Sequence, residues 1–149
     1  SRWSNWCCNP SVNSMSCERR TRGLMCRFKH FFPNLQVVTI ENGAAWIGPL
    51  MKAMDHSARM SAPRDWLYGY CPDRPSETFK QHVKVSPFPE EDIPALVNLL
   101  GPENVLAGSD WPHPEGCAEP IDYVDGLQGL SPDVVRAVMR DNTQQLFGL

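Results

Sequence analysis

The sequence contains none of the short motifs that mark the common metal, phosphate and nucleophile sites. It has no C-x-x-C pair, no H-x-H, no H-E-x-x-H, no phosphate-cradling glycine loop and no nucleophile elbow. Four of its six cysteines, Cys7, Cys8, Cys17 and Cys26, lie near the N-terminus at spacings that suit neither a zinc ribbon nor a simple disulfide framework. We therefore expect free thiols in a reducing compartment. A small metal-binding module built on these four cysteines is an alternative.

The sequence also lacks long apolar runs and a strong excess of either charge. No run approaches the roughly 20 apolar residues that span a bilayer. The N-terminal part has arginines but no apolar core followed by small residues, so we expect no secretory signal. A formal charge of −3 over 149 residues gives no reason to expect a nucleic-acid partner. We expect a cytoplasmic protein with a core of its own and no membrane or nucleic-acid partner.

The regular part of the chain follows an irregular start. Residues 1–22 are rich in Ser, Asn, Arg, Cys and Trp without a helical or strand period, and they indicate an irregular arm or sequence foreign to the fold. Residues 23–149 form the predicted domain. Strands are predicted at 35–40, 83–86 and 105–109, and helices at 47–58, 93–100 and from 131 to about 147. A long ordered loop at 61–75 and a helical turn at 76–79, capped by Ser76, are also predicted.

The order strand–helix, repeated three times, predicts an α/β fold with parallel strands and right-handed crossovers. Three such units do not close a barrel, and they leave a small sheet with two open edges.

Polar residues follow each predicted strand, and parallel strands bring such residues to one rim. Glu41 follows the first strand, Ser86 ends the second, and Asp110 ends the third, with His113 in the loop beyond. Two carboxylates and a histidine on one rim could bind a divalent metal or move protons. Structural interpretations remain open: Glu41 satisfies turn donors, Ser86 is structural, Asp110 caps the loop, and His113 packs on Trp111.

Three stretches together resemble the amidohydrolase-related (amidohydrolase 2) family of metal-dependent hydrolases. This family includes aminocarboxymuconate semialdehyde decarboxylase and several aromatic-acid decarboxylases. The stretches are Phe32-Pro-Asn-Leu-Gln-Val-Val with Glu41-Asn-Gly-Ala-Ala-Trp46, Ser86-Pro-Phe-Pro-Glu-Glu-Asp92, and Gly108-Ser-Asp-Trp-Pro-His-Pro-Glu115. The resemblance runs from about Gly23 to Leu149 and implies the last three βα units of a (β/α)₈ TIM barrel, an incomplete barrel.

The resemblance implies a role for three residues. Asp110 matches the aspartate that ends the last barrel strand and binds the catalytic metal, Zn²⁺ or another divalent ion. Glu41 lies where many relatives have a histidine that helps to activate water, which implies proton transfer. His113 matches a loop histidine that contacts or orients the substrate.

The family's H-x-H on the first strand and its histidine on the fifth are not in this sequence. A catalytic zinc site needs about three protein ligands, so Asp110 by itself does not hold one. A truncated or frame-shifted coding sequence would account for both this gap and the foreign arm.

The sequence thus predicts part of a metal-dependent hydrolase or non-oxidative decarboxylase. Its small-molecule substrate would be a cyclic or aromatic carboxylate or amide, and this chain by itself would be inactive. The alternative is a non-catalytic scaffold that keeps a partial barrel and binds a partner, such as a second copy in a homo-oligomer, through an open strand edge.

Overall fold

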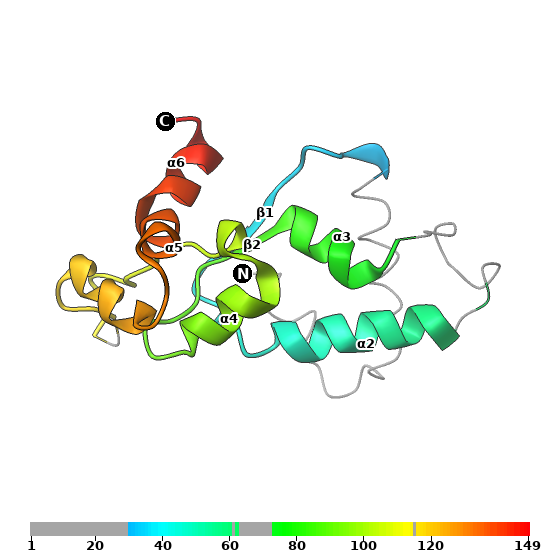
Figure 1. Ribbon diagram of the computed structural model, residues 1–149, viewed down its shortest axis with the longest axis horizontal. Helices are drawn as coiled ribbons and strands as arrows, with labels where there is room; N and C mark the ends of the chain where they lie inside the picture. The colour runs from blue at the N-terminus through cyan, green and yellow to red at the C-terminus, as the bar shows by residue number, and fades with distance from the viewer. Residues whose placement is uncertain (1–29, 61, 63–72, 115) are drawn as a thin grey trace. The chain divides into compact units, whose positions relative to one another are not determined.

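The structure is a computed structural model that describes residues 30–60, 62, 73–114 and 116–149 (Figure 1). The predicted arm at 1–22, with its four cysteines, and most of the predicted loop at 61–75 lie outside these residues. The described residues form two compact units. One contains residues 36–48 and 82–149, and the other contains the remaining described residues.

The first unit is built on two short parallel strands, β1 (Val37–Thr39) and β2 (Val83–Val85). Helices α2 (Ile47–Met60) and α3 (Pro75–His82) lie between these strands in the sequence, and most of their residues belong to the second unit. Val37 is opposite Val83, and Thr39 is opposite Val85. The predicted strands at 35–40 and 83–86 are therefore confirmed in place and direction, although both are shorter than predicted. The structure is a mixed α/β arrangement, as the strand–helix alternation indicates.

The predicted third strand at 105–109 is wrong beyond its first residues. Val105 forms a parallel bridge with Val85, and Leu106 N donates to Val85 O at 2.8 Å. The next amide, Ala107 N, donates instead to Val138 O at 3.1 Å, which belongs to the last helical segment. Backbone N–H groups alternate sides along a strand, so Ala107 N faces away from β2, and beyond Leu106 no backbone hydrogen bond between described residues continues the pairing with β2.

Helix α4 (Ile93–Leu100) follows the sequence pattern closely. The carboxylate of Asp92 accepts from Ala95 N at 2.9 Å and caps the first turn, while Gly101 ends the helix with a φ of 94°. The helix buries four residues at helical spacing, and they join the core of the first unit. That core includes Ile47, Val85, Ile93, Leu96, Val97, Leu100, Val105, Tyr123, Leu127 and Val138.

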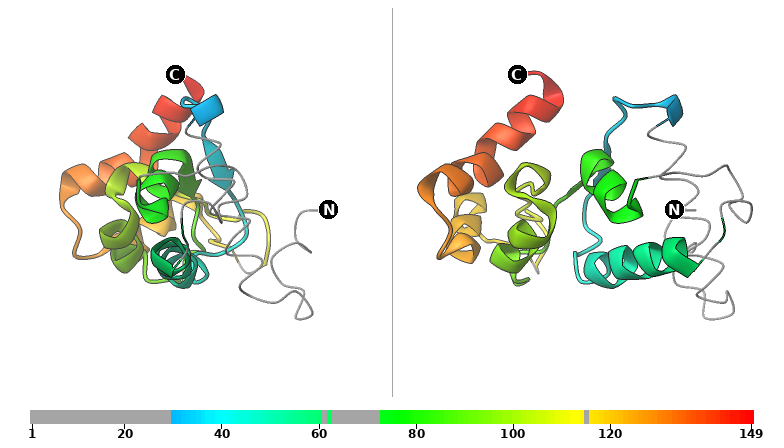
Figure 2. Two further views of the ribbon diagram at one scale, coloured as in Figure 1. Left: turned by 90° about the vertical axis from the view of Figure 1, so that its right-hand side faces the viewer. Right: turned by 45° about the vertical axis from the view of Figure 1, so that its right-hand side comes forward.

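The chain ends in one continuous helical path, drawn from orange to red in Figure 2. It consists of α5 (Pro132–Arg136), a π-helical turn (Ala137–Asp141) and α6 (Asn142–Phe147). Ser131 Oγ accepts from Val134 N and caps the first turn of α5. Val138 and Asn142 are buried, and Asn142 Nδ2 donates to Pro102 O at 2.7 Å and Val105 O at 2.8 Å. Phe147 in α6 is exposed.

In the second unit, a buried carboxylate joins α2 to α3. Asp55 on α2 accepts from Ser76 N at 3.0 Å, Ser76 Oγ at 2.8 Å and Arg74 Nη2 at 2.7 Å. Burial by itself raises the pKa of Asp55, but the hydrogen bonds from Ser76 and Arg74 outweigh it and hold that pKa below its ordinary value. Ser76 is therefore not the cap predicted for a short turn: α3 already begins at Pro75, and Asp55 accepts from its first turn.

Among the described residues, no helix has the length and apolar character needed to cross a membrane.

Candidate functional site

The ends of β1, β2 and the Val105 segment lie next to one another in the first unit. Ser86 N donates to Thr39 O at 2.9 Å, which places the end of β2 beside the end of β1. On the other side, Gly108 lies so close to Ser86 Oγ that an added Cβ atom would collide with it. The loops that carry Glu41, Pro87 and Asp110 therefore leave from one edge of the parallel segments, the predicted rim.

Two residues on this rim have an unusual backbone conformation. Glu41 has a φ of 56° and Asp110 a φ of 55°, and they are the only non-glycine residues with positive φ in the described part of the chain. L-residues avoid this left-handed region for steric reasons, and such conformations are concentrated at functional sites. Both are the acidic residues that the sequence singles out.

The Asp110 carboxylate is mostly buried, with 8% of the side chain exposed. Its Oδ1 lies 3.5 Å from Nδ1 of His113, whose side chain is 58% exposed. The loop folds back on itself, since His113 N donates to Asp110 O and Cys117 N donates to Ser109 O, both at 2.8 Å.

Glu41 is exposed, and within the described residues no hydrogen bond or ion pair joins it to Asp110 or His113. The turn that follows it is held by other groups: Asn42 Nδ2 donates to Ile40 O at 3.1 Å, and Trp46 Nε1 donates to Gly43 O at 3.0 Å. The structure thus brings Asp110 and His113 together, whereas Glu41 has no contact with either of them among the described residues.

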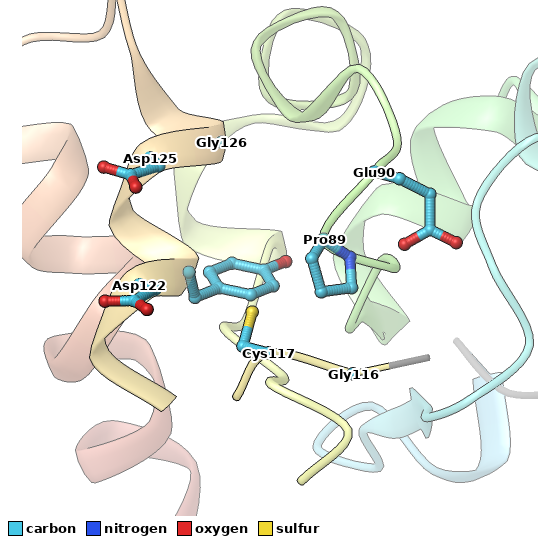
Figure 3. Close-up of a pocket in the computed structure, with 8 residues that line it drawn as sticks. Pro89, Glu90, Gly116, Cys117, Asp122, Asp125 and Gly126 are labelled. Atoms are coloured by element: carbon cyan, nitrogen blue, oxygen red, sulfur yellow. The ribbon is translucent and has the colours of Figure 1, made fainter. Parts of the chain in front are cut away.

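A pocket of about 360 Å³ lies beside the rim, between the loops that follow β2 and the Val105 segment (Figure 3). Pro89, Glu90, Gly116 and Cys117 line it together with residues of the 3₁₀-helix Pro120–Leu127. None of the three predicted site residues lines this pocket.

The pocket is lined by the acidic residues Glu90, Asp122 and Asp125 and by the thiol of Cys117. Burial raises the pKa of the Cys117 thiol, and the nearby charges of Asp122, Glu90 and Asp125 raise it further. In Figure 3 the carboxylates of Asp122 and Asp125 point away from this sulfur. A raised pKa lowers the fraction of reactive thiolate at any given pH.

Sequence reasoning missed two residues that organise the rim. Tyr123 is buried, and its hydroxyl donates to Pro87 O at 3.1 Å; burial raises the pKa of this hydroxyl, so it stays a donor. Glu91 accepts hydrogen bonds from the loop after β1. Glu91 belongs to the acidic run Glu90-Glu91-Asp92 before α4, and in the sequence such a run indicates only a favourable helix start.

Comparison with known proteins identifies the family. The family described as amidohydrolase matches residues 24–149. The chain belongs to the amidohydrolase family. The family resemblance stated from the sequence is thereby confirmed.

A solved structure supports the same assignment for the fold. This amidohydrolase chain is similar to the crystal structure of an amidohydrolase from Mycobacterium avium subsp. paratuberculosis K-10, with a TM-score of 0.76 and 30% sequence identity. The match covers 91% of this chain and 33% of that chain, so this chain spans about a third of that protein's length. A search among curated proteins found no match.

Amidohydrolases are typically metal-dependent. The described residues, however, contain no group of three His, Cys, Asp or Glu side chains placed to hold a metal ion. Asp110 and His113 are two such residues, and a catalytic zinc site needs about three ligands. The described part of this amidohydrolase does not fit a complete metal centre.

Proposed function

We propose that this chain supplies the last three βα units of a (β/α)₈ barrel in a metal-dependent hydrolase or non-oxidative decarboxylase. The parallel order of β1, β2 and Val105 and the coverage of one third of an amidohydrolase chain support this assignment. The proposed substrate is a cyclic or aromatic carboxylate or amide. Its reaction site would be at the carboxyl ends of the strands, where barrel enzymes carry their active sites.

The left-handed backbone at both Glu41 and Asp110 carries this proposal. A strained conformation costs about 1–3 kcal/mol and persists only where the surroundings enforce it. This conformation occurs at Glu41, after β1, and at Asp110, after the Val105 segment. Two such acidic residues on the same rim favour a functional role over two unrelated turns.

In the proposed enzyme each of the three residues has its own role. Asp110, mostly buried and beside His113, would contribute one ligand to a divalent metal such as Zn²⁺, with the other ligands supplied by strands that this chain does not contain. Glu41, exposed and without a described partner, would exchange a proton with the substrate or with water. His113, more than half exposed, would contact the substrate.

The test is reconstitution. The purified 149-residue chain should contain no stoichiometric zinc and should turn over no aromatic carboxylate or amide. When the remaining two thirds of the mycobacterial amidohydrolase is supplied as a separate polypeptide, the mixture should take up zinc. Stoichiometric zinc with turnover in the isolated chain would overturn the proposal that it is inactive by itself.

A matched pair of variants tests the role of Asp110 in the reconstituted mixture. Asp110→Ala should abolish zinc uptake, whereas Asp125→Ala, at an exposed aspartate on the 3₁₀-helix, should leave it unchanged. Equal zinc content in the two variants would show that Asp110 is not a ligand.

A further inference from the structure

Glu91 lies in the loop between β2 and α4, and its side chain binds the backbone of two different rim loops. Its carboxylate accepts from Ala44 N, at 2.7 Å for Oε1 and 2.9 Å for Oε2, and from Ala45 N at 3.1 Å. It also accepts from Phe88 N at 2.9 Å. One carboxylate thus joins the loop after β1 to the loop after β2.

The loop after β1 is fitted closely around this carboxylate. Gly43 has a φ of 59°, and a Cβ atom there would lie 3.3 Å from Glu91 Oε1 and 3.2 Å from the ring of Phe88. Ala44, which lies shortly before the first residue of α2, is buried. The loop therefore has little room to move away from Glu91.

The bound N–H groups lie just ahead of α2, where a helix start favours a negative charge. In many proteins such groups bind an anionic ligand. Here a side chain of the same chain, 47 positions further on, already occupies them. Hydrogen bonds to a charged acceptor are about twice as strong as neutral ones.

We propose that Glu91 is a positioning residue, a built-in anion that sets the backbone of the loop carrying Glu41. Glu41 is two residues before Gly43, and its left-handed conformation is enforced by this attachment. The proposal rests on the proposed role of Glu41 in proton transfer. It also implies that the acidic group of the substrate is recognised elsewhere, because these N–H groups are already paired.

The test compares Glu91→Ala and Glu91→Gln with Glu90→Ala and Glu90→Gln. Glu90 is the adjacent, exposed glutamate, so it is a matched control. Amide hydrogen exchange of Ala44, Ala45 and Phe88 should become roughly tenfold to hundredfold faster in Glu91→Ala, as expected for the loss of hydrogen bonds to a charged group. Glu91→Gln, which keeps one acceptor oxygen, should show a smaller increase, and the Glu90 variants none.

A second measurement separates positioning from general stabilisation. The three-bond coupling between the amide and α protons of Glu41 reports its φ, and it should change in Glu91→Ala but not in Glu90→Ala. Sodium acetate should restore it in Glu91→Ala by refilling the vacated anion position, whereas sodium chloride of equal ionic strength should not.

Unchanged exchange at Ala44 and Ala45, or an unchanged Glu41 coupling, in a folded Glu91→Ala variant would overturn the proposal. None of these measurements needs metal or substrate. Failure of zinc uptake in the reconstituted barrel would therefore count against the proposed function but would not affect the positioning role of Glu91 measured by exchange and coupling.

Discussion

Replacing Gly116 with alanine should destabilise the loop that carries Asp110, and the structure indicates by how much. A Cβ atom at Gly116 would lie 2.5 Å from Ser109 O and 2.7 Å from Asp110 O. Ordinary carbon contacts begin near 3.5 Å, so the backbone would have to shift by about 1 Å. The hydrogen bonds from Gly116 N to His113 O and from Cys117 N to Ser109 O oppose that shift. Overpacking against backbone atoms costs about 1–3 kcal/mol.

Gly48 provides the matched control. It lies in α2, and a Cβ atom there would meet only Leu99 Cδ2, at an ordinary 3.7 Å. Alanine is the better helix former by up to about 1 kcal/mol, so Gly48→Ala should leave stability unchanged or raise it. The two glycine-to-alanine changes are thus predicted to have opposite signs.

Urea unfolding followed by circular dichroism measures both variants against the parent chain. Gly116→Ala should lower the free energy of unfolding by about 2 kcal/mol, which corresponds to a Tm lower by roughly 4–8 °C. A Gly116→Ala variant within about 0.5 kcal/mol of the parent, the range of ordinary surface substitutions, would refute the reasoning.

Three further predictions concern the rest of the chain. Because the pKa of Asp55 lies below its ordinary value of 3.8, its carboxylate contributes stability that is fully present above that pH and is lost as the pH falls through the lowered pKa. The difference between the urea midpoints of the parent and Asp55→Asn should therefore stay constant above that pH and shrink only below it; a difference that does not shrink there would contradict this. The Cys117 thiol should be alkylated by iodoacetamide more slowly in the folded parent chain than in the parent chain unfolded in urea, and the folded Asp122→Asn variant should react faster than the folded parent. Peptide mass spectrometry measures these three rates, and equal rates would show that the pKa of Cys117 is not raised. Asn142→Ala removes the hydrogen bonds to Pro102 O and Val105 O and should lower the free energy of unfolding in urea by about 2–3 kcal/mol. The control Asn42→Ala, at an exposed amide, should lower it by less than about 1 kcal/mol, and similar losses in the two variants would contradict the role of Asn142.

Local signals in the sequence were enough to predict most elements and the rim. Helix α4 is encoded within a few residues, by the Asp92 cap, apolar positions at helical spacing and the terminating Gly101. Strand–helix alternation predicted the parallel order, and the polar residue after each strand predicted that the loops carrying Glu41 and Asp110 leave from one edge. These inferences need only the period of each element and the direction of the chain.

Hydrogen bonds between residues far apart in the sequence could not be predicted from local sequence patterns. Ala107 N donates to Val138 O, and nothing near Ala107 in the sequence indicates a helical partner. Ser76 looks like a cap, but its donors go to Asp55, 21 residues earlier. The Tyr123 hydroxyl likewise binds a carbonyl 36 residues earlier.

The sequence by itself determined the family, the alternating order of strands and helices, and the two acids at strand ends, because periodicity, capping and motif residues are local properties. Only the tertiary structure decided what the acidic run Glu90-Glu91-Asp92 does. Asp92 caps its own helix, whereas Glu91 binds amides 46 and 47 positions away. The difference arises because a carboxylate satisfies whichever donors the fold brings within hydrogen-bonding distance, and that choice is made by packing rather than by neighbouring residues.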